Sequence, residues 1–377
     1  MPSAARPTQS YTGHLPAISS GFVTALYLFD VAQAIDVAAL GADLGGRAVP
    51  ATLDDKSAGP PRLRYVQPPV VVDGQALDCA ELDGFHVRVK FYDYGVISLM
   101  LTRPFAGSWS DLVTLGQTLI ENEPLEDHAT DACRRIVARI TPMLSAPRAS
   151  YLSEDYLVFA VTSLEGRPSA REVLASHGGE IAQLLRGERL PLSADERDVV
   201  LRHQLSYLAD DLVVPAWNAA FLYDTEAAAL SAVEIVEFAN SQLLELRYHD
   251  DVLEAELTKL YGELQHPRWS DRFTRRHARA VLRLQALFIE VNELTDRTGN
   301  AVKFVGDVYA ARLFGLVGDR LGLSRWKGSV EDKLRTIDEI RRFAVEQAGI
   351  NQANVLELAI LLILLLELGL FFAGIME

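Results

Sequence analysis

The chain has 377 residues, of which 49% are hydrophobic, so it can bury a large core. Acidic residues outnumber basic ones by 51 to 36, and the formal net charge of −15 argues against a nucleic-acid-binding surface, which needs clustered Lys and Arg. The two cysteines, Cys79 and Cys133, are too far apart in sequence to indicate a disulfide framework or a metal site, and they fit a reducing compartment.

Residues 1–20 are rich in Ser, Pro and Thr and are predicted to be disordered. They lack a basic segment followed by an apolar one, so we expect no secretory signal. Residues 21–190 predict an α+β domain with helices on one face of a mixed sheet. The predicted strands are Phe22–Phe29, Phe85–Phe91, Val96–Leu101 and Asp155–Leu164, and the predicted helices are Val31–Leu44, Trp109–Glu121, Asp127–Leu144 and Ser169–Leu185.

A β-hairpin is the most specific local feature of this domain. The strand Phe85–Phe91 alternates apolar and polar residues, and the strand that follows is mostly apolar. Between them, Tyr92, Tyr94 and Gly95 belong to a Tyr-Asp-Tyr-Gly segment with the composition of a turn.

Residues 191–350 are predicted to be helical and to form a long antiparallel bundle or coiled-coil-like stalk. A first helix runs from Leu192 to about Leu212, before Pro215. The stretch from Thr225 to Leu264 has apolar residues at intervals of three and four, as in a bundle. A second long helix is predicted from Arg272 to about Leu316, and a third begins after Ser329 and continues toward the C-terminus.

Residues 353–376 contain an almost unbroken apolar run, which predicts a single transmembrane helix, because a bilayer-spanning helix needs about 20 apolar residues. The alternative is a helix buried in a soluble oligomer. Arginines precede the run, so the positive-inside rule places the bulk of the chain in the cytoplasm, at a bacterial inner membrane rather than a mitochondrial one.

Two glutamates within the predicted span, Glu357 and Glu367, are the strongest candidate functional residues, because ionisable groups in a membrane segment are functional by default. We expect them to face a neighbouring helix. Gly369 and Ala373 provide a small-xxx-small spacing for close helix packing. These four residues predict assembly of the membrane helix into a homo-oligomer or with an unknown partner protein.

The sequence indicates no catalytic, cofactor-binding or metal-binding residues. The adjacent residues His249, Asp250 and Asp251 resemble a metal cluster in composition, but consecutive residues of a helix point in different directions and cannot converge on one ion. No Gly-rich phosphate loop, nucleophile elbow or HExxH sequence occurs.

Three passages together resemble the family named for being required for meiotic nuclear division, a domain of unknown function. They are the hairpin FYDYGVISL (Phe91 to Leu99), the stretch Gly187 to Asp224 with its proline-aromatic segment (Pro215, Trp217 and Phe221), and Leu356-Glu357 followed by Glu367. The interval between Pro215 and Glu357 is longer than in that family, and a tryptophan that often follows the hairpin is missing. The resemblance implies a membrane-anchored, homo-oligomeric, non-enzymatic protein.

We therefore expect a tail-anchored, self-associating membrane scaffold or adaptor with a cytoplasmic α+β domain and no catalysis. One alternative is an ion channel or transporter component resembling the CorA magnesium channels, although the chain has one predicted span and no Gly-Met-Asn sequence. Another alternative is an enzyme, which a deep cleft with converging ionisable groups in the α+β domain would indicate.

Overall fold

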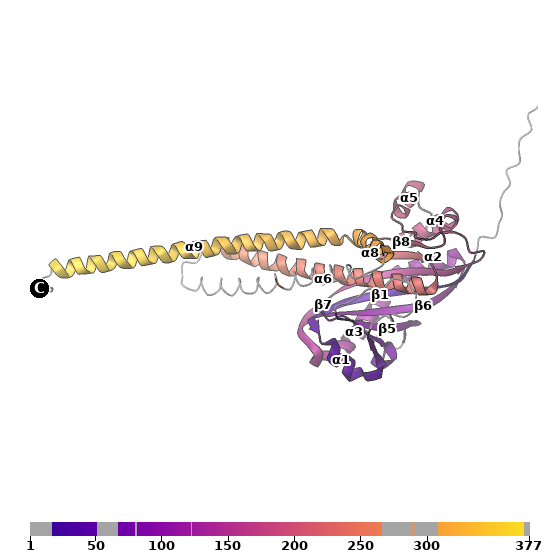
Figure 1. Cartoon of the computed structure of the whole chain (residues 1–377), viewed down its shortest axis with the longest axis horizontal. Coiled ribbons are helices and arrows are strands. Elements are labelled where there is room, and N and C mark those ends of the chain that lie inside the picture. Colours follow the sequence, from indigo (N-terminus) through magenta and orange to yellow (C-terminus); the bar gives the residue numbers. More distant parts are fainter. Residues whose placement is uncertain are drawn as a thin grey trace, which may run out of the picture. The chain divides into compact units, whose positions relative to one another are not determined.

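The computed structural model describes residues 17–50, 67–79, 81–121, 123–265, 289 and 308–372. Within these residues one sheet has the strand order β2-β3-β5-β6-β1-β7-β9-β8, and β4 pairs with β5 (Figure 1). The strands are β1 (Ile18–Ile35), β2 (Ala48–Pro50), β3 (Val70–Asp73), β4 (Glu81–Leu82), β5 (Phe85–Phe91), β6 (Val96–Gly107), β7 (Leu144–Leu164), β8 (Leu212–Pro215) and β9 (Ala219–Tyr223). The helices are α1 (Val37–Leu44), α2 (Trp109–Ile120), α3 (Glu123–Ile140), α4 (Ala170–Arg186), α5 (Ala194–Leu201), α6 (Glu226–Gln265), α8 (Val308–Leu321) and α9 (Leu323–Phe372).

Strand β1 lies in the middle of the sheet, between β6 and β7, and pairs with both in antiparallel fashion. Its residues from Gly21 to Ala32 are all buried, because both faces of the sheet are covered here. We predicted a strand ending at Phe29 and a helix from Val31, but the strand continues to Ile35. The helix starts only after Asp36, whose side chain accepts a hydrogen bond from the backbone N–H of Ala39 at 2.9 Å.

Helices α2, α3 and α4 cover one face of the sheet. The hydrophobic core beneath them includes Trp109 and Leu112 of α2, Ile136 of α3, Ile181 of α4 and Phe159 of the sheet. All strand pairs are antiparallel except β7 with β9, which is parallel. The sheet is therefore mixed, and the α+β part of the prediction agrees with the structure.

The first half of α6 covers the opposite face of the sheet (Figure 1). Every residue from Ile235 to Glu245 is buried, so this part of α6 is an internal helix of the α+β unit. The predicted coiled-coil stalk is therefore wrong for this segment. Apolar residues spaced at three and four suit a helix packed on a sheet as well as one packed on another helix, so their periodicity does not separate the two.

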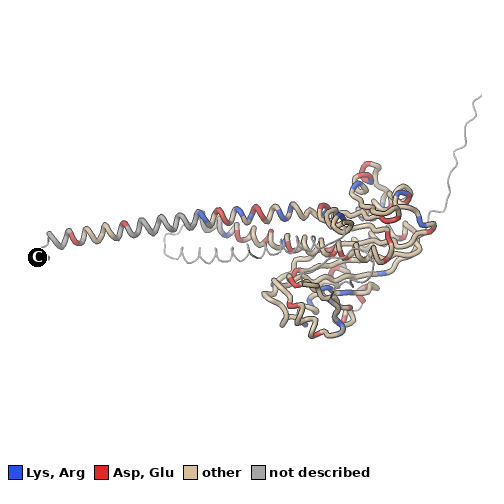
Figure 2. Tube along the Cα trace, in the orientation of Figure 1, with Lys and Arg blue, Asp and Glu red and all other residues tan. Residues whose placement is uncertain are grey.

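The other helices predicted for the stalk have three different outcomes. Most of the predicted helix Arg272–Leu316 lies outside the described residues, and its end lies in helix α8. The predicted helix from Leu192 to Leu212 is only the short α5, and Pro215 ends strand β8 rather than a helix. Helix α9 is continuous from Leu323 to Phe372, with basic and acidic residues interspersed along its first part (Figure 2).

The predicted membrane span of residues 353–376 is wrong, since no helix within the described residues is long and apolar enough to cross a bilayer. The side chains described in this region are Glu357, Glu367 and the aliphatic run Ile360–Leu365, all of them exposed. Three further predictions rested on that span: the tail anchor, the single-pass membrane localisation and the membrane as a partner. They are therefore wrong as well.

The chain divides into two compact units. The first comprises Met1–Glu245 and Thr298–Ser324, and the second comprises Leu246–Arg297 and Arg325–Glu377. The sheet and helices α1 to α5 belong to the first unit, together with the first half of α6. The second half of α6 and nearly all of α9 belong to the second.

Candidate binding site

The hairpin residues singled out in the sequence lie in the interior, where the turn between β5 and β6 meets α6. Tyr92 and Tyr94 are 1% and 9% exposed, and their rings stack with centroids 5.1 Å apart. Ser241 of α6 donates its hydroxyl proton to the carbonyl of Phe238, so Tyr94 is the donor in its 2.8 Å hydrogen bond to Ser241. Gly95 completes the turn with φ +94°. These residues hold α6 on the sheet and offer no surface to a ligand.

A buried ion pair lies beside this turn. Lys90 of β5 pairs with Glu237 of α6, and their side chains are 5% and 0% exposed. Ser98 lies opposite Lys90 in the β5–β6 register and is also buried. At the same face, Asp30 of β1 accepts two 3.2 Å hydrogen bonds from Nε of Arg148. The Lys90–Glu237 pair is removed from solvent and joins α6 to the sheet, so it serves packing rather than substrate binding.

The structure does not bring the proline-aromatic residues together. Pro215 ends β8 and Phe221 is fully buried in β9, where its ring lies 5.7 Å from that of Trp109. Trp217 is 63% exposed in the turn between these strands. Two of the three residues therefore belong to the core.

The polar residues singled out in the helical region remain separate from one another. Glu357 and Glu367 are exposed on α9, the surroundings of Gly369 are not described, and Ala373 lies outside the described residues. Asp250 accepts hydrogen bonds from Ser329 and Lys333, as a helix-pairing residue does. In the described part of the chain, no group of His, Cys, Asp and Glu side chains could hold a metal ion.

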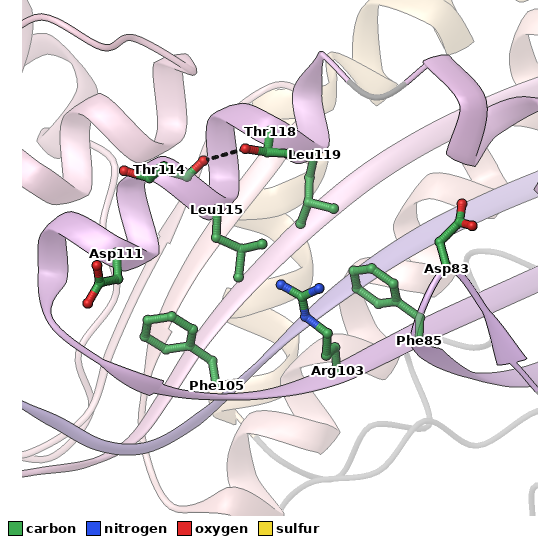
Figure 3. Close-up of a pocket in the computed structure, with 9 residues that line it drawn as sticks. All are labelled: Asp83, Phe85, Arg103, Phe105, Asp111, Thr114, Leu115, Thr118 and Leu119. Atoms are coloured by element: carbon green, nitrogen blue, oxygen red, sulfur yellow. Dashed lines mark hydrogen bonds between the residues drawn. The ribbon is translucent and has the colours of Figure 1, made fainter.

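The site that sequence reasoning missed is an open pocket of about 390 Å³ between α2 and the strands β5 and β6. Ser108 and Asp111 form a capping box that starts α2, so that the helix passes over the end of β6. The pocket is lined by Asp83, Phe85, Arg103, Phe105, Asp111, Thr114, Leu115, Thr118 and Leu119 (Figure 3). Its volume lies at the lower end of the roughly 300–1,000 Å³ of small-molecule sites.

Arg103 is the central polar group of the pocket. Figure 3 shows its side chain between the rings of Phe85 and Phe105, and its guanidinium carbon lies 5.1 Å from the centroid of the Phe85 ring. Among the described residues, no carboxylate lies within ion-pair distance of this guanidinium. The half-buried arginine thus presents its N–H edges to the open pocket.

The two acids at the rim have other partners. Oδ2 of Asp111 accepts hydrogen bonds from the backbone N–H and the hydroxyl of Ser108, at 3.0 and 2.7 Å. The Ser108 hydroxyl and then its backbone N–H lower the pKa of Asp111, so this carboxyl is ionised at neutral pH. Asp83 lies 2.9 Å from Nδ1 of His128. Figure 3 shows the two acids at opposite ends of the pocket, with Arg103 between them.

The threonines of α2 contribute acceptors. The hydroxyl of Thr114 donates to the carbonyl of Ser110, and that of Thr118 donates to the carbonyl of Thr114, both at 2.9 Å. Because these protons are already used, the hydroxyl oxygens are left with lone pairs that accept hydrogen bonds. The pocket therefore combines one cationic donor, an apolar wall, an acid at each end and neutral acceptors at its rim.

Two residues that line this pocket, Arg103 and Phe105, lie just beyond the predicted strand Val96–Leu101. We ended the second hairpin strand at Leu101, before Thr-Arg-Pro, whereas β6 continues to Gly107. Pro104 is tolerated opposite Phe22 near the strand end. With β6 extended, Leu101, Arg103 and Phe105 alternate on the face beneath α2.

The fold and the pocket define a mixed α+β protein with a ligand-sized hollow on one face of its sheet. The chain belongs to the family described as "Uncharacterized protein MJ0711, N-terminal domain", whose model matches residues 20–229. It is 25% identical over 195 residues to the uncharacterized protein MJ0711 of Methanocaldococcus jannaschii, and the alignment covers 52% of this chain and 59% of that protein. This chain therefore spans less than two thirds of its relative's length. No solved structure matches.

The resemblance to the required-for-meiotic-nuclear-division family is wrong, because the family match lies elsewhere. The passages that suggested it were short and generic. The hairpin passage covers only the end of β5, the turn and the start of β6, and the stretch Gly187 to Asp224 covers three separate elements, α5, β8 and β9.

Proposed function

We propose that this protein is a non-catalytic adaptor whose α+β unit recognises a partner in the pocket under α2. The observation that carries the proposal is Arg103, a half-buried guanidinium in an apolar pocket with no carboxylate among the described residues to pair with it. Such a group recognises an anionic ligand by charge and by hydrogen bonds.

The arrangement of the acids supports binding rather than catalysis. General acid–base chemistry needs ionisable groups that converge on one reacting atom. Asp83 and Asp111 lie at opposite ends of the pocket, and each accepts a hydrogen bond from a neighbouring side chain of this chain (Figure 3). These contacts position the walls and leave Arg103 as the recognition group.

The second unit supplies the other half of an adaptor. Nζ of Lys333 on α9 lies 3.0 Å from Oδ2 of Asp250 and 2.9 Å from Oε2 of Glu254, both on α6. Ser329 adds a 2.7 Å hydrogen bond to Asp250. These contacts hold the two helices of the second unit together.

The test uses full-length protein immobilised as wild type, Arg103→Gln and Arg88→Gln. Arg88 is a matched control, because it is an exposed arginine on the neighbouring strand β5 and alternates to the opposite face of the sheet. We expect the wild type and Arg88→Gln to retain the same proteins from a cell extract and Arg103→Gln to lose at least one of them. Retention of an identical set by Arg103→Gln would overturn the proposal.

A further inference from the structure

The charge of the pocket selects a monoanion. The guanidinium of Arg103 lies over the Phe85 ring, and two parallel N–H groups of a guanidinium match the two oxygens of a carboxylate. Asp111 is ionised at the rim, and the carboxyl of Asp83 stands at the other end. With one acid at each end of the pocket and a single arginine between them, a doubly charged phosphate is disfavoured more than a singly charged carboxylate.

The walls of the pocket select a bulky apolar group next to that carboxylate. Phe85 and Leu119 are buried at its floor, and Phe105 and Leu115 are half-buried. Figure 3 shows Leu115 and Leu119 of α2 directed toward the strands and Arg103. A ligand that covers these side chains gains about 25 cal/mol for each Å² of apolar surface removed from water.

The rim of the pocket favours a ligand that carries an N–H donor. The hydroxyl oxygens of Thr114 and Thr118 accept hydrogen bonds, because their protons are committed to backbone carbonyls one turn earlier. A carboxylate, a bulky apolar side chain and an amide N–H occur together in the last residue of a polypeptide.

We propose that the pocket binds the carboxyl-terminal residue of a partner protein that ends in Leu, Ile or Phe, an inference that rests on the adaptor function above. The terminal carboxylate pairs with Arg103, the terminal side chain lies against Phe85, Phe105 and Leu115, and the terminal amide N–H donates to Thr118.

The probes are the peptide N-acetyl-Ala-Ala-Leu as the free acid and the same peptide as the carboxamide, titrated into full-length protein by calorimetry. We expect the acid to bind wild type and Arg88→Gln equally. The carboxamide should bind at least tenfold more weakly than the acid, and Arg103→Gln should lose at least tenfold for the acid. Arg103→Lys should bind at an intermediate level, because it keeps the charge but not the paired N–H geometry.

Two further measurements separate the possible outcomes. Thr118→Val should weaken the acid several-fold without changing the thermal unfolding midpoint, since Thr118 is exposed and its hydroxyl bonds only one turn back within α2. Free leucine and inorganic phosphate are the competing ligands, and tighter binding of either than of the peptide acid would overturn the inference. Equal binding of acid and carboxamide, or no binding of the acid, would also overturn it. The adaptor function would survive those results if protein retention still depended on Arg103.

Discussion

Lys90 and Glu237 carry the most consequential charges in the first unit, because both are buried between the sheet and α6. Removing one partner leaves the other charge without compensation in the interior, which costs roughly 3–5 kcal/mol. We therefore expect Lys90→Met to lower the free energy of unfolding by about that amount, measured by urea denaturation.

The double variant Lys90→Met/Glu237→Leu should recover most of that loss, because no charge then remains buried. Arg134→Ala is the control: its ion pair with Asp131 is 66% and 58% exposed, and its loss should cost less than about 1 kcal/mol. Strictly additive losses in the double variant would contradict this account.

Both cysteines are buried, and burial raises the pKa of the Cys79 and Cys133 thiols. A raised pKa keeps a thiol protonated as the pH rises, so the reactive thiolate is scarce at pH 8. We expect neither thiol to react promptly with a chromogenic disulfide reagent in native protein, and both to react in urea. Fast stoichiometric labelling of the native chain would contradict the burial of these residues.

At the scale of elements, the β5–β6 turn depends on a single glycine. A side chain at Gly95 would place Cβ 1.7 Å from the carbonyl oxygen of Ala32, and its φ of +94° is itself unfavourable for other residues. We expect Gly95→Ala to lower the free energy of unfolding by about 4 kcal/mol or more, as measured by urea denaturation.

Gly84→Ala provides the comparison for Gly95→Ala, because Gly84 also has a positive φ, of +79°, but open space around its Cβ position. Its cost should be limited to backbone strain of about 1–2 kcal/mol. Equal losses for the two variants would mean that the turn relaxes away from β1.

The pairing of α6 with α9 in the second unit has a predictable pH dependence. Burial opposes the charge of Lys333, but the hydrogen bonds that its ammonium donates to the carboxylates of Glu254 and Asp250 outweigh this and raise its pKa. A raised pKa stabilises the folded form at every pH below the unfolded value of about 10.4, and this contribution is lost as the pH rises through the folded value.

We therefore expect Lys333→Met to have a lower thermal unfolding midpoint than the wild type at pH 8. Above about pH 10.5 the difference between the two midpoints should become smaller. Lys327→Met is the control, because its 3.8 Å pair with Glu331 lies within α9 and is about half exposed. An unchanged difference at high pH would show that Lys333 acts through packing alone.

Local patterns predicted some elements well and others poorly, for physical reasons. The hairpin follows from alternation and turn composition, and the helix Glu226–Gln265 follows from its apolar spacing. The end of β1 was missed because Val31 and Ile35 fit either a helix or a strand, and tertiary burial decides between them. Arg103 lies beyond the predicted strand, which ended at Leu101 with the apolar run, and the contact of Arg103 with α2 depends on long-range packing.

At the scale of the whole molecule, the family match and the first compact unit end at different residues of the chain. The match ends at residue 229, near the start of α6, so it includes the pocket and excludes the residues of α6 that seal the second face of the sheet. The sequence predicted the sheet and its helices, but it assigned α6 to a stalk, because nothing local shows that Glu237 and Ser241 meet Lys90 and Tyr94.

The central position of β1 has a consequence for synthesis of the chain on the ribosome. The first strand to emerge needs β6 and β7 as neighbours, and these begin only at Val96 and Leu144. At about 5–20 residues per second, the interval lasts on the order of several seconds. Until synthesis reaches β6, the apolar stretch from Gly21 to Ala32 has no strand to pair with. During that time the nascent chain exposes a site that a holding chaperone can bind.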